Sequence, residues 1–206
     1  MIAIVDYGVG NLFSLKSSLK SIGADCIVTN EKSVLEKANG IILPGVGAFG
    51  DAVNKLRALG LDKVLIDLAN KGKPLFGICL GMQLLFEKSY EYGSHKGLGL
   101  IKGEVKPLDG KVGDLKIPHM GWNSLDFVNQ TPIFKYINNG DYVYFVHSFY
   151  ADCEKTFLTS TAKYGFNVTA SVSNGNVFGT QFHPEKSGET GLKILKAFVD
   201  YTENLC

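Results

Sequence analysis

The sequence GICLG at residues 77–81 constrains the fold of this 206-residue chain more than any other segment. An apolar run at 74–78 leads into it, and a helical pattern follows it. When a strand turns sharply into a helix, the turn residue sits in strained backbone and bulky neighbours clash, so both flanking positions favour glycine. We therefore expect a buried strand that ends at Cys79 and a helix that starts directly after it.

This turn would give Cys79 unusual chemistry. A thiol at a helix N-terminus lies near unpaired backbone N–H groups, which favour the thiolate, and the N–H of Leu80 can then stabilise an oxyanion. For this segment alone, the alternative is a buried cysteine between two packing glycines. Cys26, Cys153 and Cys206 lack such a context, and no CxxC pair is present, so we expect reduced thiols in a cytoplasmic protein.

A nucleophilic cysteine needs a base, and the base needs a group that orients it. Of the four histidines, His183 is followed two residues later by Glu185, and residues at this spacing share one side of an extended segment. Pro184 between them excludes a helix. The sequence therefore predicts a Cys-His-Glu triad of Cys79, His183 and Glu185.

A second glycine-rich turn, PGVG at 44–47, follows an apolar run. If that run is a parallel strand, its carboxyl end can present backbone N–H groups to a substrate. Val46 or Gly47 would then supply a second oxyanion donor. The alternative is an ordinary turn between a strand and a helix.

The fold class follows from how apolar segments alternate. Over residues 1–90, expected strands at 1–6, 26–29, 40–43 and 74–78 alternate with helices at 12–22, 34–38, 49–71 and from Cys79 through Phe86, which predicts parallel βαβ units. Beyond Gly97 we expect short strands at 100–107, 115–118, 142–146, 157–162, 167–173 and 176–181, and a last helix at 188–203. The prediction is one α/β domain: a mostly parallel central sheet flanked by helices, with an additional antiparallel or mixed β region.

Composition excludes several functions. The formal net charge of +1 argues against nucleic-acid binding, and no apolar run or basic leader indicates a membrane span or signal peptide. Gly8 and Gly10 start a G-x-G-x-x-G pattern that lacks its third glycine, so dinucleotide binding is not expected. His119 and His147 lack carboxylate–histidine spacing for a metal. We expect neither a cofactor nor a metal.

Six motifs together carry a family resemblance. They are GICLGMQ (77–83), QFHPEKS (181–187), DYGVGNL (6–12), LPGVGAF (43–49), PHMGWN (118–123) and FVHSFY (145–150). The chain resembles the class I (triad) glutamine amidotransferases over essentially its whole length, as a single type 1 domain covering 1–206. The PHMGWN segment is most similar to the glutaminase subunits of this family that serve histidine biosynthesis.

The resemblance implies hydrolysis of glutamine to glutamate and ammonia through a γ-glutamyl thioester. It makes Cys79 the nucleophile, His183 the general base and acid, and Glu185 the group that orients His183. The positions that match the family's oxyanion and substrate-binding residues are Leu80, Gly45, Val46, Gly47, Gln83, Ser148 and Phe149.

The resemblance also implies a partner. Family members of this type form a heterodimer with a (β/α)8-barrel cyclase subunit, and ammonia passes through the barrel to react with a ribonucleotide. The products are imidazole glycerol phosphate and an aminoimidazole carboxamide ribotide. Asn11, His119, Met120 and Trp122 fall in segments that resemble the docking surface. The resemblance further implies that the glutaminase has little activity until the cyclase is bound and liganded. We hypothesise that the loop at 44–47 is the element that switches this activity on.

Three alternatives remain. A paralogous glutaminase could supply ammonia for amidation of a bacterial surface sugar, because residues 89–96 and the segment after Phe149 depart from the common histidine-pathway pattern. An inactive partner-binding regulator could share the fold, although the intact triad argues against it. A stand-alone hydrolase or peptidase could use the same strand–turn–helix arrangement.

Overall fold

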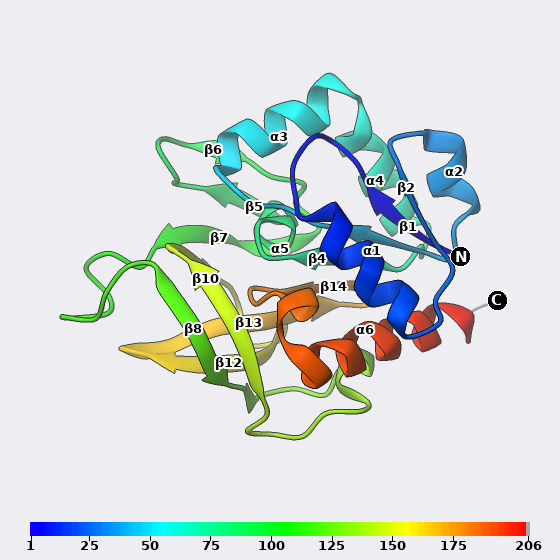
Figure 1. The fold of residues 1–206 in the computed structure, drawn as a ribbon. Coiled ribbons are helices and arrows are strands. Elements are labelled where there is room, and N and C mark those ends of the chain that lie inside the picture. The colour runs from blue at the N-terminus through cyan, green and yellow to red at the C-terminus, as the bar shows by residue number, and fades with distance from the viewer. Residues whose placement is uncertain (205–206) are drawn as a thin grey trace.

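The computed structural model describes residues 1–204, built around a central sheet of eight strands in the order β2-β1-β3-β4-β14-β13-β12-β9 (Figure 1). The strands of this sheet are β1 (Ile2–Val5), β2 (Cys26–Thr29), β3 (Gly40–Leu43), β4 (Leu75–Ile78), β9 (Asp126–Phe127), β12 (Leu158–Tyr164), β13 (Phe166–Asn174) and β14 (Val177–Thr180). The first five strands in this order pair in parallel, and the last three continue the sheet antiparallel. The predicted α/β class, with its mostly parallel sheet and antiparallel extension, is confirmed.

Helices cover both faces of the parallel half (Figure 1). They are α1 (Leu12–Ser21), α2 (Lys32–Lys37), α3 (Phe49–Ala58), α4 (Leu61–Asn70), α5 (Leu80–Leu84) and α6 (Gly188–Glu203), with 3-10 turns η1 (Pro132–Phe134) and η2 (Pro184–Lys186). Apolar side chains of α1 and α6 pack on one face, and those of α2, α3 and α4 pack on the other. Strands β1, β3 and β4 are therefore buried on both faces, which explains why they are apolar without alternation. None of the helices in residues 1–204 is long and apolar enough to cross a membrane.

Two smaller sheets complete the structure. One joins β10 (Tyr142–His147) to β8 (His119–Ser124), and the other has the order β11-β7-β5-β6. The strands of the latter are β5 (Phe86–Ser89), β6 (His95–Lys96), β7 (Ile101–Pro107) and β11 (Phe149–Asp152). Both sheets lie beside the carboxyl end of β4 (Figure 1) and place their loops near Cys79.

Two predicted elements are wrong. Residues 115–118 form no strand; the strand starts at His119, because β8 is defined by its pairing with the distant β10. The helix after Cys79 stops at Leu84 instead of reaching Phe86, which begins β5. The carbonyl of Leu84 accepts a hydrogen bond from the N–H of Leu98 at 2.8 Å. The following segment therefore satisfies this carbonyl in place of a further helical turn.

The turn between β4 and α5 is packed against the end of β3. A Cβ on Gly81 would overlap the carbonyl oxygen of Leu43, and a Cβ on Gly77 would lie 2.6 Å from the carbonyl oxygen of Gly81. The N–H of Cys79 donates to the carbonyl of Thr180 at 2.7 Å, which ties the turn to β14. Both glycines therefore serve packing of backbone on backbone, as the G-x-C-x-G pattern predicts.

Replacing Gly81 with alanine is expected to lower the free energy of unfolding by about 3 kcal/mol or more, because backbone lies where the Cβ must go. Gly72→Ala is the matched control: its φ is +89° but nothing lies within 4 Å, so only conformational strain of about 1 kcal/mol is added. Urea unfolding of both variants measures the difference, and equal losses would contradict the packing explanation.

Candidate active site

The edge where β4 and β14 end brings the predicted nucleophile and base together. These strands are parallel neighbours, with Ile78 opposite Thr180, so Cys79 and the segment that leads to His183 leave the sheet side by side. Carboxyl ends of parallel strands meet at one edge of a sheet, and this is where α/β proteins place their sites.

Cys79 occupies the turn itself. Its φ of 54° and ψ of −111° lie in the left-handed half of the backbone map, which non-glycine residues rarely enter. The residue is 7% exposed, and it borders a cavity of about 310 Å³. Strain of this kind persists only where surrounding contacts enforce it, and here the packing around Gly77 and Gly81 does so.

His183 and Glu185 form a buried pair. The imidazole Nδ1 lies 2.8 Å from Glu185 Oε1, and the two side chains are 3% and 4% exposed. Burial alone would lower the pKa of His183, but hydrogen bonds to Cys79 and Glu185, and the charges of both groups, raise it to about 10. The site therefore favours an imidazolium, which a base that has taken a proton from a thiol becomes.

The backbone that joins His183 to Glu185 is not the extended segment that the sequence predicts. His183 is extended, with φ −100° and ψ 100°, but Pro184–Lys186 form a 3-10 turn with proline at its start. Proline suits this position because its missing N–H has no partner there and its φ is already fixed. The pairing of His183 with Glu185 is present, but a turn produces it.

Ser187, which the sequence does not single out, holds His183 in place. Its hydroxyl donates to the carbonyl of His183 at 2.6 Å and accepts the N–H of Tyr144 at 2.9 Å. The N–H of His183 donates in turn to the carbonyl of Tyr144 at 3.0 Å. These bonds fix the base against β10. Its place at the end of the QFHPEKS motif is the signal that could have found it.

Most of the predicted oxyanion and substrate-binding residues surround the same cavity as Cys79. The lining residues are Val46, Gly47, Cys79, Leu80, Gln83, Glu91, Pro118, Val146, His147, Ser148, His183 and Lys186. Gly45 and Glu185 lie just behind it and line a smaller void. Phe149 is not part of the lining; it acts through its carbonyl, which accepts Gln83 Nε2 at 3.2 Å.

The loop at 44–47 is anchored by Tyr7, a second residue that sequence reasoning missed. The hydroxyl of Tyr7 donates to the carbonyl of Pro44 at 2.7 Å. Burial, and then the charge of Cys79, raise the pKa of Tyr7, so the hydroxyl keeps its proton. A Cβ on Gly45 would come within 2.8 Å of that hydroxyl, which explains the glycine there.

Glu91 adds a negative charge to the cavity. Its Oε2 accepts the N–H of Phe49 at 2.5 Å, and burial raises the pKa of the carboxyl despite this bond. A carboxylate fixed in a cavity of this kind can bind an ammonium group. The sequence offers no signal for Glu91, because only the fold brings it to the cavity.

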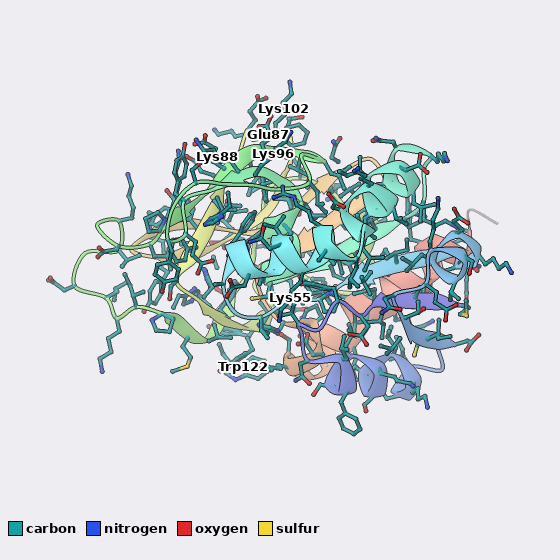
Figure 2. All side chains as sticks on the ribbon, turned by 90° about the horizontal axis from the view of Figure 1, so that it is seen from above. Lys55, Glu87, Lys88, Lys96, Lys102 and Trp122 are labelled. Atoms are coloured by element: carbon teal, nitrogen blue, oxygen red, sulfur yellow. The ribbon has the colours of Figure 1, made fainter. Side chains whose placement is uncertain are left out.

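The predicted docking residues divide by exposure. Met120 and Trp122 on β8 are 64% and 56% exposed, and Figure 2 shows Trp122 at the edge of the molecule, near the start of α6. Asn11 is partly buried; it caps α1 through Ser14 and lines the same small void as His183 and Glu185. His119 is 3% exposed, so it does not reach the surface of the chain.

Comparisons with known proteins identify the family of the chain. Residues 3–201 match the family model described as glutamine amidotransferase class-I. A Bacillus cereus protein named imidazole glycerol phosphate synthase subunit HisH is 51% identical over 203 residues, which is 98% of this chain and 96% of the relative. An Oceanobacillus iheyensis protein of the same name is 49% identical over 199 residues, 96% of this chain and 98% of the relative.

Solved structures share the fold at lower identity. The chain in "Crystal structure of glutamine amidotransferase" gives a TM-score of 0.77 at 17% identity and covers 98% of this chain and 100% of its own. A chain of PurLQS from Thermotoga maritima gives 0.72 at 24% identity, with 97% of each chain covered.

Glu185→Gln is expected to lower the pKa of His183, because it removes the carboxylate charge that favours the imidazolium. The raised pKa of His183 in the folded state, to which Cys79 and Glu185 both contribute, stabilises the fold fully below about pH 6.5, the unfolded value, and this stabilisation is lost as pH rises through about 10. The stability advantage of the wild type over Glu185→Gln should therefore be fully present near pH 6 and be lost as pH rises through about 10, the folded-state pKa of His183 in the wild type. NMR titration of His183 and urea unfolding against pH measure both effects. An advantage that grew with pH would contradict the assignment.

Proposed function

The chain belongs to the class-I glutamine amidotransferase family, and we propose that it is the glutaminase subunit of imidazole glycerol phosphate synthase. The observation that carries the chemistry is the meeting of a thiol at a strained turn with a buried imidazole–carboxylate pair beside one cavity. The name shared by relatives at about 50% identity, over nearly the whole chain, supports the specific subunit.

The proposed reaction begins with Cys79. His183 takes the thiol proton, and the sulfur attacks the side-chain carboxamide carbon of glutamine to give a tetrahedral oxyanion. His183 then gives its proton to the leaving nitrogen, so that the C–N bond breaks and ammonia departs. A water molecule, deprotonated by His183, attacks the resulting thioester, and glutamate leaves as the thiol is restored. Glu185 orients His183 and supports its charged form throughout.

Backbone groups and side chains around the cavity support this sequence. The N–H of Leu80 and an N–H of the 44–47 loop are the proposed oxyanion donors. Glu91 is suited to the α-ammonium group of glutamine. Gln83 and the backbone of Ser148 complete the proposed substrate contacts.

Ammonia release explains the need for a partner. Ammonia that escapes into neutral water is mostly protonated and loses its nucleophilicity, so we propose direct transfer to a (β/α)8-barrel cyclase. Met120 and Trp122 offer an exposed apolar pair on β8. Pro118, directly before β8, lines the catalytic cavity, so the proposed docking strand lies next to the site of ammonia release.

The proposal is tested by assembling the chain with the cyclase from its own source and measuring glutamate release with and without the ribonucleotide acceptor. Stimulation by the ribonucleotide supports the histidine-pathway role. Stimulation only by a component of surface-sugar amidation would select the paralogue. Full activity of the isolated chain would favour a stand-alone hydrolase, and none under any condition would favour a regulator.

Cys79→Ala is expected to lower glutamine-dependent turnover of the complex by about 10⁴-fold or more, because no other group can form the thioester. Turnover with added ammonium salt should be retained, since it bypasses this site. Cys26→Ala is the matched control and should behave as wild type, because this half-buried thiol lies on the edge strand β2 and does not line the cavity. Retention of glutamine-dependent turnover by Cys79→Ala would refute the nucleophile.

Trp122→Ala is expected to weaken binding to the cyclase by about 30-fold or more, since an exposed tryptophan buried on association is a frequent energetic centre of an interface. Lys102→Ala is the control, because Figure 2 shows Lys102 on the opposite side of the molecule from Trp122. Isothermal titration of each variant with the cyclase gives the two affinities. Equal losses would place the interface elsewhere.

A further inference from the structure

Two buried histidines that the proposed chemistry does not use are bonded to each other beside the cavity. His119 Nδ1 lies 2.9 Å from His147 Nε2, and the residues are 3% and 6% exposed. His119 is on β8 and His147 is the last residue of β10, so the contact joins the two strands of one small sheet. His147 also lines the cavity.

The surroundings fix the direction of every hydrogen bond. His147 Nδ1 faces the carbonyl oxygen of Phe149 at 2.8 Å, so this nitrogen carries the proton and donates. In the neutral ring, Nε2 then accepts, and His119 Nδ1 must donate to it. His119 Nε2 is left to accept from Asn123 Nδ2, at 3.3 Å.

Both rings stay neutral in the working range of an enzyme. Burial lowers the pKa of His147 to about 3, against the bond to Phe149, which raises it. Burial lowers the pKa of His119 to about 4. One fixed tautomer in each ring is therefore maintained near neutral pH.

The hydrogen bonds continue from this pair to the nucleophile. The Phe149 carbonyl also accepts Gln83 Nε2, and the same nitrogen donates to Gln181 Oε1 at 2.9 Å. Gln181 is fully buried, and its Nε2 lies 3.7 Å from the sulfur of Cys79. We call the set Asn123, His119, His147, Gln83 and Gln181, together with the Phe149 carbonyl, the histidine–glutamine chain.

We propose that His119 and His147 are positioning residues that hold the Phe149 carbonyl, and through it Gln83 and the Ser148 backbone, in the arrangement that binds glutamine. This inference rests on the proposed glutaminase function and goes beyond the triad and its substrate contacts. Neither histidine touches the reacting atoms; each acts through the segment that follows β10.

The histidine–glutamine chain also connects the glutamine site to the strand that carries the proposed docking residues. On β8, His119 and Asn123 face inward, while Met120 and Trp122 between them are exposed. The His119 ring is stacked between Phe145 and Tyr164, with centroids 4.7 and 4.0 Å away. A ring clamped in this way moves with its strand, so a shift of β8 reaches Phe149 through rigid groups.

The test uses two amide substitutions at His147 in the complex with the cyclase. An asparagine amide reaches about as far as Nδ1, so His147→Asn retains the bond to Phe149 and loses the one to His119. A glutamine amide reaches about as far as Nε2, so His147→Gln retains a partner for His119 and loses the bond to Phe149. We expect His147→Gln to raise KM for glutamine about tenfold and His147→Asn to raise it less than threefold, the loss of one buried hydrogen bond setting the scale.

His119→Phe tests the far end of the chain, because it preserves the stacking and removes both ring nitrogens. We expect it to raise KM for glutamine about fivefold. Turnover with ammonium salt should stay within twofold of wild type in every variant, since the histidine–glutamine chain serves only the glutamine site. Phe127→Leu, which removes the stacking on Phe134 at 4.6 Å and no hydrogen bond of the histidine–glutamine chain, should lower the melting temperature without changing KM.

Each outcome bears on one hypothesis. An unchanged KM in His147→Gln, or a rise in KM that follows the loss of thermal stability and appears equally in Phe127→Leu, would overturn the positioning role. If the wild-type complex released no glutamate from glutamine, the proposed glutaminase function itself would be refuted. That result comes from the wild type alone, so it is distinguishable from failure of the positioning role.

Discussion

The structure depends on one close contact between backbones, where the first turn of α5 crosses the end of β3. At Gly81 there is no space for a Cβ beside the Leu43 carbonyl. This contact forces Cys79 into a positive φ and directs its side chain to the cavity at the edge of the sheet. The same crossing sets the 44–47 loop, which follows β3, against α5. A proposed oxyanion donor and the proposed nucleophile are thus placed by a single packing constraint.

Three buried histidines show how the surroundings of a ring decide its protonation. His183 has a carboxylate partner and the thiol, and its pKa is raised in spite of burial. His119 and His147 have no carboxylate partner, and burial lowers the pKa of both, with the charge of His183 lowering that of His147 further. One ring is therefore ready to hold a proton during catalysis, while the other two keep fixed tautomers that support directional hydrogen bonds. All three have similar exposure, so the difference comes from the neighbouring charge and not from solvent.

The local patterns were sufficient for most elements of the parallel half. The strands at 26–29 and 40–43 and the last helix at 188–203 match the structure residue for residue, because apolar runs and glycine stops are read from neighbours in sequence. The expected strand at 115–118 failed, because β8 is decided by pairing with a strand about twenty residues away. The short strands β5, β6, β9 and β11 escaped prediction for the same reason. The pairing of His183 with Glu185 was foreseen, but the 3-10 turn that produces it was not.

The sequence by itself determined the reactive groups: the thiol between two glycines, and the imidazole with a carboxylate two residues away. These follow from stereochemistry within a few residues, which needs no knowledge of distant contacts. Only the tertiary structure decided what surrounds them. Separate elements meet where Tyr7 contacts the 44–47 loop, where Glu91 borders the cavity and where Ser187 bonds to the carbonyl of His183. The bond between His119 and His147 likewise joins two elements. The physical reason is that burial and hydrogen-bond direction depend on which segments the sheet brings together, and a spacing in one segment carries no record of its neighbours in space.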